Sequence, residues 1–259
     1  MQKESIKFES STVFEGMTSI RALIKGIDEG NTDRRLERLF FDRDRKQKIY
    51  KELGYLRAIS EKYGFEIVES DAHELEKITL GTSHGGLVLL ASDRTLPRLT
   101  ESTPLKPDGF YVMLEGIEDP YNFGYCLRSL YAMGCDGIIL TERNWMSAAG
   151  VVCRSSAGAS ECLPIYVTDG NDVIEIFKAA GYTVVSADEH TDNILGKCPL
   201  TLPLLLIVGG EKRGISKKLL SDCDMLVKID YARDFRASLS AASATTMFAY
   251  EIRRQNKTK

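Results

Sequence analysis

Residues 204–251 read LLLIVGGEKRGISKKLLSDCDMLVKIDYARDFRASLSAASATTMFAYE, and this stretch decides the fold. The apolar run 204–208 predicts a buried parallel strand, and 225–229 predicts a second one. A run of small residues at 238–246 then enters a predicted helix that ends near Arg254. Strand ends and a helix start made of Gly, Ser and Ala let the backbone approach a ligand closely. In open α/β sheets such crevices lie at the carboxyl ends of strands, so we expect a ligand site here.

The preceding part of the chain repeats this alternation of strand and helix. Apolar runs predict further strands at 110–114, 137–140, 163–167 and 182–187. Helices are expected between them, from the turn at 119–122 to Met133, at 147–156 and at 171–180. Six apolar strands with helices between them predict a parallel, doubly wound sheet in an α/β domain over residues 109–259.

A smaller α/β unit is expected at the N-terminus, over residues 1–95. Strands are predicted at 36–41, 65–68 and 87–91, and helices at 21–27, 49–63 and 71–78, the last with Asp71 as its cap. Residues 1–20 are polar and poorly patterned, which predicts a loosely held arm. Residues 96–108 carry three prolines and no periodicity, which predicts a linker between the two domains.

The composition is typical of a globular protein with a sizeable core. The chain has 259 residues, of which 43% are hydrophobic, and its net charge of −3 gives no overall basic character that would indicate a nucleic-acid partner. No apolar run approaches the roughly 20 residues of a membrane span, and the first residues, MQKESIKFES, lack the apolar centre of a signal peptide. We therefore expect a cytoplasmic protein with no membrane partner.

Neither the cysteines nor the histidines form a pattern that predicts a metal site. The six cysteines include no C-x-x-C pair, which favours separate reduced thiols. The three histidines, His73, His84 and His190, are dispersed along the chain. No metal is expected.

The densest group of basic residues lies in the N-terminal unit. Interleaved acidic residues at 33–44 largely cancel its charge. Two interpretations stay open, a solvated ionic face and a contact surface for phosphate groups. The basic residues are Arg34, Arg35, Arg38, Arg43, Arg45, Lys46 and Lys48.

Three motifs in the second domain carry residues suited to chemistry. In the first, EGIEDPYNFGYCLRS (115–129), Asn122 precedes a predicted helix and Arg128 follows six residues later. Arg128 would lie about two turns into that helix, at roughly 3.6 residues per turn. Its guanidinium could reach back toward the helix start and hold a phosphate or a polarised oxygen. The alternative interpretation is an asparagine cap and a surface arginine.

The second and third motifs come from the stretch quoted first. VGGEKRGIS (208–216) is a glycine turn after a strand, and SLSAASA (238–244) places small residues at a helix start. The glycine turn is not a P-loop, because no Gly-Lys-Ser/Thr tail follows, and it is not the G-x-G-x-x-G of a first Rossmann strand. The small residues permit either close helix packing or close approach of a ligand.

In this order, the three motifs resemble the signature of the SpoU (TrmH-like) branch of the SPOUT RNA methyltransferases. That signature has an Asn with an Arg six residues on, then a Gly-x-Glu-x-x-Gly turn and a Ser-Leu-Asn helix start. The segment SSAGA (155–159), followed by the strand at Leu163 and Pro164, is also similar to the family's middle segment. The N-terminal unit resembles the small ribosomal-protein-like RNA-binding domain that many members carry.

The resemblance implies a fold and a reaction. Members of the family bind S-adenosyl-L-methionine in a deep trefoil knot formed by the C-terminal segments, and they work as homodimers. Because chain knots are rare, the knot is expected here only through the resemblance. The implied activity is methyl transfer to a ribose 2′-hydroxyl of RNA, with ribosomal RNA favoured over tRNA as the substrate.

The resemblance also implies roles for particular residues. Cofactor contacts would be made by Gly209, Ile229 and Leu239, with Val208, Gly210 and Ser238 lining the same pocket. The catalytic group would consist of Asn122, Arg128, Glu211, Ser238 and Ser240.

One position departs from the family pattern. Ser240 stands where Asn usually follows Ser-Leu, and its hydroxyl is shorter than an amide and offers fewer bonds. This departure favours a second hypothesis, a non-catalytic RNA-binding protein of the same fold, whereas the intact Asn122, Arg128 and Glu211 oppose it. A nicotinamide-dependent oxidoreductase is a third hypothesis, disfavoured because no glycine-rich turn of the required kind follows the first strand.

Two interpretations also stay open for the loop before the last helix. Residues 230–237 are strongly charged and include Arg233 and Arg236. These arginines are either phosphate contacts for RNA or exposed loop charges.

Overall fold

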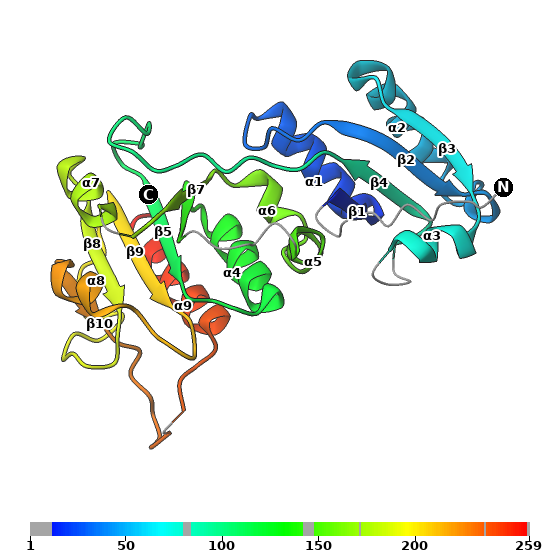
Figure 1. The fold of residues 1–259 in the computed structure, drawn as a ribbon. Coiled ribbons are helices and arrows are strands. Elements are labelled where there is room, and N and C mark those ends of the chain that lie inside the picture. The colour runs from blue at the N-terminus through cyan, green and yellow to red at the C-terminus, as the bar shows by residue number, and fades with distance from the viewer. Residues whose placement is uncertain (1–11, 80–83, 142–147, 171, 236, 258–259) are drawn as a thin grey trace. The chain divides into compact units, whose positions relative to one another are not determined.

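The computed structural model describes residues 12–79, 84–141, 148–170, 172–235 and 237–257 (Figure 1). Contacts divide the chain into two compact units. Unit 1 comprises Met1–Thr95 and Asn144–Cys162, and unit 2 comprises Leu96–Arg143 and Leu163–Lys259. The functional domain limits expected from the sequence, 1–95, 96–108 and 109–259, stay predictions.

Unit 1 contains a mixed sheet of four strands in the order β1–β4–β2–β3. β1 (Val13–Glu15) and β2 (Leu36–Asp42) run antiparallel to β4 (Leu87–Ala91), and β3 (Glu66–Ser70) is parallel to β2. The helical elements are α1 (Gly16–Asp28), η2 (Arg43–Arg45), α2 (Tyr50–Tyr63), α3 (Ala72–Ile78), α5 (Ala149–Ser155) and α6 (Ala159–Cys162).

Alternating side chains give this sheet two buried faces. Leu39 of β2 and Leu89 of β4 are fully buried in a core with the apolar residues of α1 and α2. Val88 and Leu90, which alternate with them on β4, pack with Leu75 of α3. The alternation follows from the two-residue repeat of a strand, so helices cover both faces.

The sequence predicts most of unit 1, but not its beginning. Asp71 caps α3 by accepting a hydrogen bond from the Glu74 N–H at 2.9 Å, as expected. The expectation of a loose arm at 1–20 is wrong for the described part, because β1 and the start of α1 lie there, with Phe14 and Ile20 buried. A three-residue strand is too short to show a period. Residues 1–11 lie outside the described residues.

Most of the basic cluster at 34–48 is neutralised by ion pairs. Arg34 is buried: its Nε donates to Glu161 Oε2 at 3.1 Å, and its Nη1 donates to the Ser92 carbonyl oxygen at 2.7 Å. These ion pairs favour the interpretation of the cluster as a solvated ionic face. The buried Arg34 contributes to packing and not to phosphate binding. The exposed pairs are Arg38–Glu66, Arg43–Asp71, Arg45–Asp42 and Lys46–Glu69.

Unit 2 contains a six-stranded sheet, and the order β10–β8–β9–β5–β6–β7 is parallel throughout. All six predicted strands are confirmed. They are β5 (Phe110–Glu115), β6 (Gly137–Thr141), β7 (Ile165–Thr168), β8 (Thr183–Ala187), β9 (Leu204–Gly209) and β10 (Met225–Val227). The helices are α4 (Pro120–Met133), α7 (Val173–Ala179), α8 (Lys217–Asp222) and α9 (Ala241–Gln255). The predicted helix starts at 147 and 171 lie outside the described residues.

Helices cover both faces of this sheet (Figure 1). α7 and α8 cover one face, where Phe177 and Leu219 pack with Met113 and Ile207 of the central strands. α4 and α9 pack against each other on the other face. The expected linker is held at the sheet edge, because the Leu99 N–H donates to the carbonyl oxygen of Val167 in β7 at 2.8 Å.

The start of α4 corrects one detail of the sequence analysis. Asp119, and not Asn122, caps the helix: its Oδ1 accepts a hydrogen bond from the Tyr121 N–H at 2.9 Å. Pro120 occupies the first helical position, where its missing N–H costs nothing. Asn122 therefore lies inside the first turn of α4, and its side chain is left for other contacts.

Candidate active site at the carboxyl edge of the sheet

The carboxyl ends of β5, β9 and β10 lie at the same edge of the parallel sheet. Gly116 follows β5, Gly209 ends β9, and Ile229 follows β10. The strand order reverses between β5 and β9, because β6 and β7 lie on one side of this pair and β8 and β10 on the other. Open α/β sheets bind their ligands at such a switch point.

Glycines allow backbone segments to meet at this edge. A Cβ atom on Gly210 would lie 2.1 Å from the Gly116 carbonyl oxygen, and one on Gly209 would lie 2.5 Å from the Gly214 carbonyl carbon. The Gly210 N–H donates to the Glu115 carbonyl oxygen at 2.7 Å, and the Gly214 N–H donates to the Gly210 carbonyl oxygen at 2.9 Å. The turn after β9 thus packs directly against the turn after β5, and the backbone contacts leave no room for a side chain at Gly209 or Gly210.

Glu211 connects the starts of two helices. Its Oε1 accepts a hydrogen bond from Asn122 Nδ2 at 3.0 Å and another from the Ala241 N–H at 3.3 Å. Asn122 lies in the first turn of α4, and Ala241 is the first residue of α9. A carboxylate is favoured there, because helix starts carry unpaired N–H groups and a partial positive charge. The structure therefore brings together Asn122, Glu211 and the start of α9.

Ser240 keeps one function that an asparagine would serve. Its hydroxyl caps α9 by accepting a hydrogen bond from the Ser243 N–H at 3.2 Å. Serine and asparagine are about equally good caps, so the departure at 240 preserves the helix start. The longer amide that the family pattern places here is missing.

The remaining expected cofactor contacts lie around this edge. Ile229 and Leu239 are half-buried, Ser238 is exposed, and Val208 is buried within β9. The Leu239 N–H donates to the Tyr231 hydroxyl at 3.1 Å. In the described part of the chain, no hydrogen bond joins Ser238 to the catalytic residues expected from the sequence.

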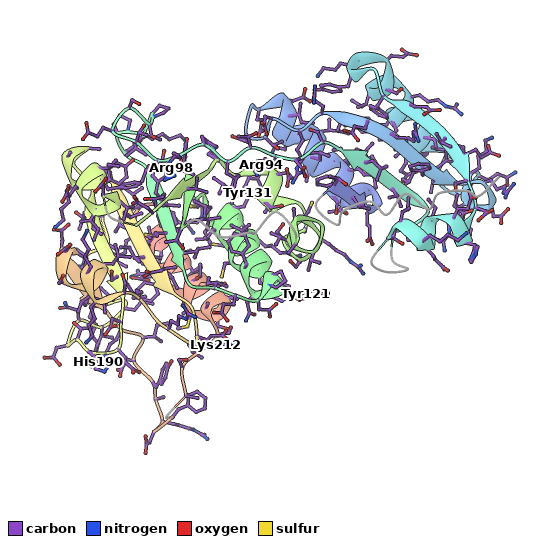
Figure 2. The ribbon with its side chains drawn as sticks, in the orientation of Figure 1. Arg94, Arg98, Tyr121, Tyr131, His190 and Lys212 are labelled. Carbon is purple, nitrogen blue, oxygen red and sulfur yellow. The ribbon has the colours of Figure 1, made fainter. Side chains whose placement is uncertain are left out.

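Arg128 lies apart from the pair of Asn122 and Glu211. Six residues along a helix turn the side chain by about 240°. Arg128 therefore leaves α4 on a different face from Asn122 and shares the exposed face of Tyr121 and Tyr125; Figure 2 shows Tyr121 at the start of the helix. The guanidinium is exposed and forms no hydrogen bond or ion pair with another described residue.

The structure adds two residues that the sequence analysis did not single out. Glu115 Oε2 accepts a hydrogen bond from the Ser216 N–H at 2.9 Å, which fixes the far end of the glycine turn. Its position at the end of a central strand is the signal that could have identified it. Tyr231 holds Leu239, but no period or spacing in its loop marks it. Lys212, labelled in Figure 2, pairs with Glu118 at 2.9 Å on the outside of the turn.

The thiol of α4 near this edge is buried. Burial raises the pKa of Cys126, on α4, to about 12, so the thiol is protonated at neutral pH and is a poor nucleophile. Among the described residues, no group of three or more His, Cys, Asp and Glu side chains could hold a metal ion. Within the same residues, no helix has the length and apolar character needed to cross a membrane.

The fold and the site define an α/β protein of the parallel-sheet class, with its polar site residues gathered at the switch point of the sheet. The chain belongs to the SpoU rRNA Methylase family, whose sequence profile matches residues 109–250. This match covers the whole sheet of unit 2 and all three motifs.

Known proteins agree with this assignment. The chain is 31% identical over 202 residues to an uncharacterized tRNA/rRNA methyltransferase of Mycobacterium leprae (strain TN), covering 75% of this chain and 64% of the relative. The chain thus spans less than two thirds of the length of this relative. The crystal structure of the SpoU methyltransferase AviRb from Streptomyces viridochromogenes, in complex with AdoMet, has a TM-score of 0.76 and 25% identity, covering 94% of this chain and 89% of that one. The AdoMet-bound rRNA methyltransferase from Sinorhizobium meliloti shares the fold, with a TM-score of 0.78 at 23% identity over 95% and 88% of the two chains.

Proposed function

We propose that this protein is an S-adenosylmethionine-dependent methyltransferase that acts on a ribose 2′-hydroxyl of RNA. The observation that carries the proposal is the junction at Glu211, which joins Asn122 of α4 to the start of α9 beside the glycine turn. Membership of the SpoU family and the AdoMet complexes of two structural relatives support the cofactor.

The residues at the carboxyl edge fit the cofactor chemically. Gly209 is half-buried without a side chain, and the half-buried Ile229 and Leu239 offer apolar surface for an adenine ring. No charged side chain is needed for such a pocket, which backbone groups and apolar contacts can form. Val208, Gly210 and Ser238 would line it. When bound there, the cofactor supplies an electrophilic methyl group on a sulfonium sulfur.

The protein's own groups would align the ribose hydroxyl and remove its proton. Asn122 Nδ2 gives one of its two hydrogens to Glu211, so the second is left to donate to the oxygen of the ribose hydroxyl. Glu211 Oε2 forms no hydrogen bond within the described residues and can take the hydroxyl proton as a general base. A guanidinium is a very poor base, so Arg128 would bind the adjacent phosphate and stabilise the developing oxyanion. The exposed Ser238 and the capping Ser240 would complete the site.

Several further features belong to the same proposal. Ribosomal RNA is favoured over tRNA, because unit 1 resembles a ribosomal-protein-like RNA-binding domain, and residues 1–95 would hold the RNA. The resemblance to the family supports a C-terminal trefoil knot and a homodimer. A cytoplasmic location belongs to the same proposal, because an RNA substrate of this kind would be met there.

The experiment is methyl transfer from tritium-labelled S-adenosylmethionine to total RNA from cells that lack this protein. After the incubation, ribosomal RNA and tRNA are separated and counted. We expect label in ribosomal RNA. Label in tRNA alone would identify tRNA, and not ribosomal RNA, as the substrate. Binding of the cofactor in calorimetry without label in any RNA would favour a non-catalytic RNA-binding protein.

A further inference from the structure

Two exposed aromatic rings lie on the segment that joins β10 to α9. Figure 1 shows this segment projecting away from the sheet of unit 2. Phe235 is 56% exposed and Tyr231 is 37% exposed. Their ring centroids are 6.1 Å apart, with an angle of 60° between the ring planes. The rings thus pack on each other and leave much of their surface in water.

Isolated exposed aromatic residues are common on protein surfaces, but this pair is fixed to the candidate site. The Tyr231 hydroxyl accepts the Leu239 N–H at 3.1 Å, so one ring is tied to the residue just before the cap of α9. Two residues further, the Ala241 N–H binds Glu211. A short series of bonds therefore connects the aromatic pair with the residues that would hold the ribose.

Charges of both signs surround the pair, with Arg233 between the exposed Asp230 and Asp234. Arg233 lies between the two aromatic residues, and Arg213 lies two residues after Glu211. Both side chains are exposed, and neither forms an ion pair with another described residue. Arg233, which follows Tyr231 by two residues, suits single-stranded nucleic acid together with the exposed rings, because rings can stack on bases while a guanidinium meets a phosphate.

We propose that Tyr231 and Phe235 form a stacking platform for an unpaired base of the RNA beside the target ribose, with Arg233 on the neighbouring phosphate. A base within a helix has both faces covered by its neighbours, so only a base in a loop, bulge or single strand can use such a platform. The platform would therefore select unpaired RNA. This inference rests on the proposed function for the nature of the substrate.

The test measures binding of an RNA of about 12 nucleotides, within the range of single-strand site sizes, that carries one 2-aminopurine. The same RNA is used single-stranded and annealed to its complement, with full-length wild-type, Phe235→Leu and Phe235→Trp proteins. Stacking on the ring quenches 2-aminopurine. We expect Phe235→Leu to weaken single-strand binding about 5- to 150-fold and to remove the quenching. Phe235→Trp keeps an aromatic face and should bind within about 3-fold of wild type on the same reasoning.

The matched variants distinguish stacking from other roles of Phe235. Leucine preserves an apolar side chain without a ring, and duplex binding should be equal for all three proteins. Unchanged single-strand binding by Phe235→Leu would overturn the platform. If Phe235→Leu changed the sedimentation of the protein but not its RNA binding, the platform would also be overturned, and Phe235 would instead contact a second copy of the chain. Because binding needs no methyl transfer, a quenching signal without transfer would support the platform while contradicting the proposed function.

Discussion

Replacing Glu211 with glutamine separates a chemical role of this side chain from a structural one. The amide oxygen of glutamine can still accept the hydrogen bonds that Oε1 now accepts from Asn122 Nδ2, at 3.0 Å, and from the Ala241 N–H, at 3.3 Å. Only the charge and the basic Oε2 are lost. The variant therefore tests whether the carboxylate takes the hydroxyl proton.

The chemical role and the structural role of Glu211 predict very different effects on Tm and on kcat. A hydrogen bond to a charged acceptor is about 1 kcal/mol more stabilising than one to a neutral acceptor, and the exposed position of Glu211 reduces this difference. For a chain of this size that corresponds to a fall in Tm of about 2–4 °C at most. Loss of a general base costs about 10²- to 10⁴-fold in kcat. We expect the small change in Tm together with the large change in kcat.

The assay combines thermal unfolding, calorimetry with S-adenosylmethionine and steady-state methyl transfer to RNA. Asn122→Ala is the control, since it removes the partner of Oε1 but leaves the carboxylate in place. It should raise KM for RNA more than Glu211→Gln does. A Glu211→Gln enzyme with a kcat within about 5-fold of wild type would refute the assignment of the base, given the expected range.

Three further predictions follow from other parts of unit 2. Gly210→Ala places a Cβ atom 2.1 Å from the Gly116 carbonyl oxygen, and we expect about 3 kcal/mol of destabilisation in chemical denaturation. The matched control Gly54→Ala lies in a helix with open space around it and should stabilise the protein by about 0.5–1 kcal/mol. Equal effects of the two substitutions would contradict the steric argument. Arg128→Ala should abolish turnover and leave the cofactor Kd within about 2-fold of wild type, because the exposed guanidinium forms no bond within the described residues; weakened cofactor binding would indicate a structural role. Hydrogen bonds from Arg254, and then Gln255, lower the pKa of Glu251 from its ordinary value of 4.5. The stabilisation from this lowered pKa is therefore fully present above about pH 4.5 and is lost as the pH falls through the folded-state value. Glu251→Gln should flatten this part of the stability profile, and an unchanged acid limb in pH-dependent unfolding would show that another group is responsible.

The fold was predictable where residues follow a strong local rule. The six strands of unit 2 are built on apolar runs, and α4 is followed by Gly134, whose φ of 86° few other residues adopt. β1 and the start of α1 were missed, because Val13–Glu15 is too short to show a period and draws its stability from pairing with β4. Tertiary pairing of this kind leaves no local mark in a sequence.

The candidate site was predictable only in part, for a related reason. The resemblance to the family pointed to Asn122 and Glu211, whose side chains meet, although the sequence places them on separate segments. Asp119 was not distinguished from Asn122 as the cap of α4, because both residue types suit that position. Tyr231 could not be found at all, since its bond to Leu239 depends on how one loop folds back on itself.

The position of the transferred methyl group tests the central claim most directly. RNA labelled by the wild-type protein is digested with alkali, which cleaves next to a free 2′-hydroxyl but leaves the bond beside a methylated ribose intact. The junction of Asn122 and Glu211 predicts label in an alkali-resistant dinucleotide. Label confined to mononucleotides would place the methyl group on a base and contradict the account.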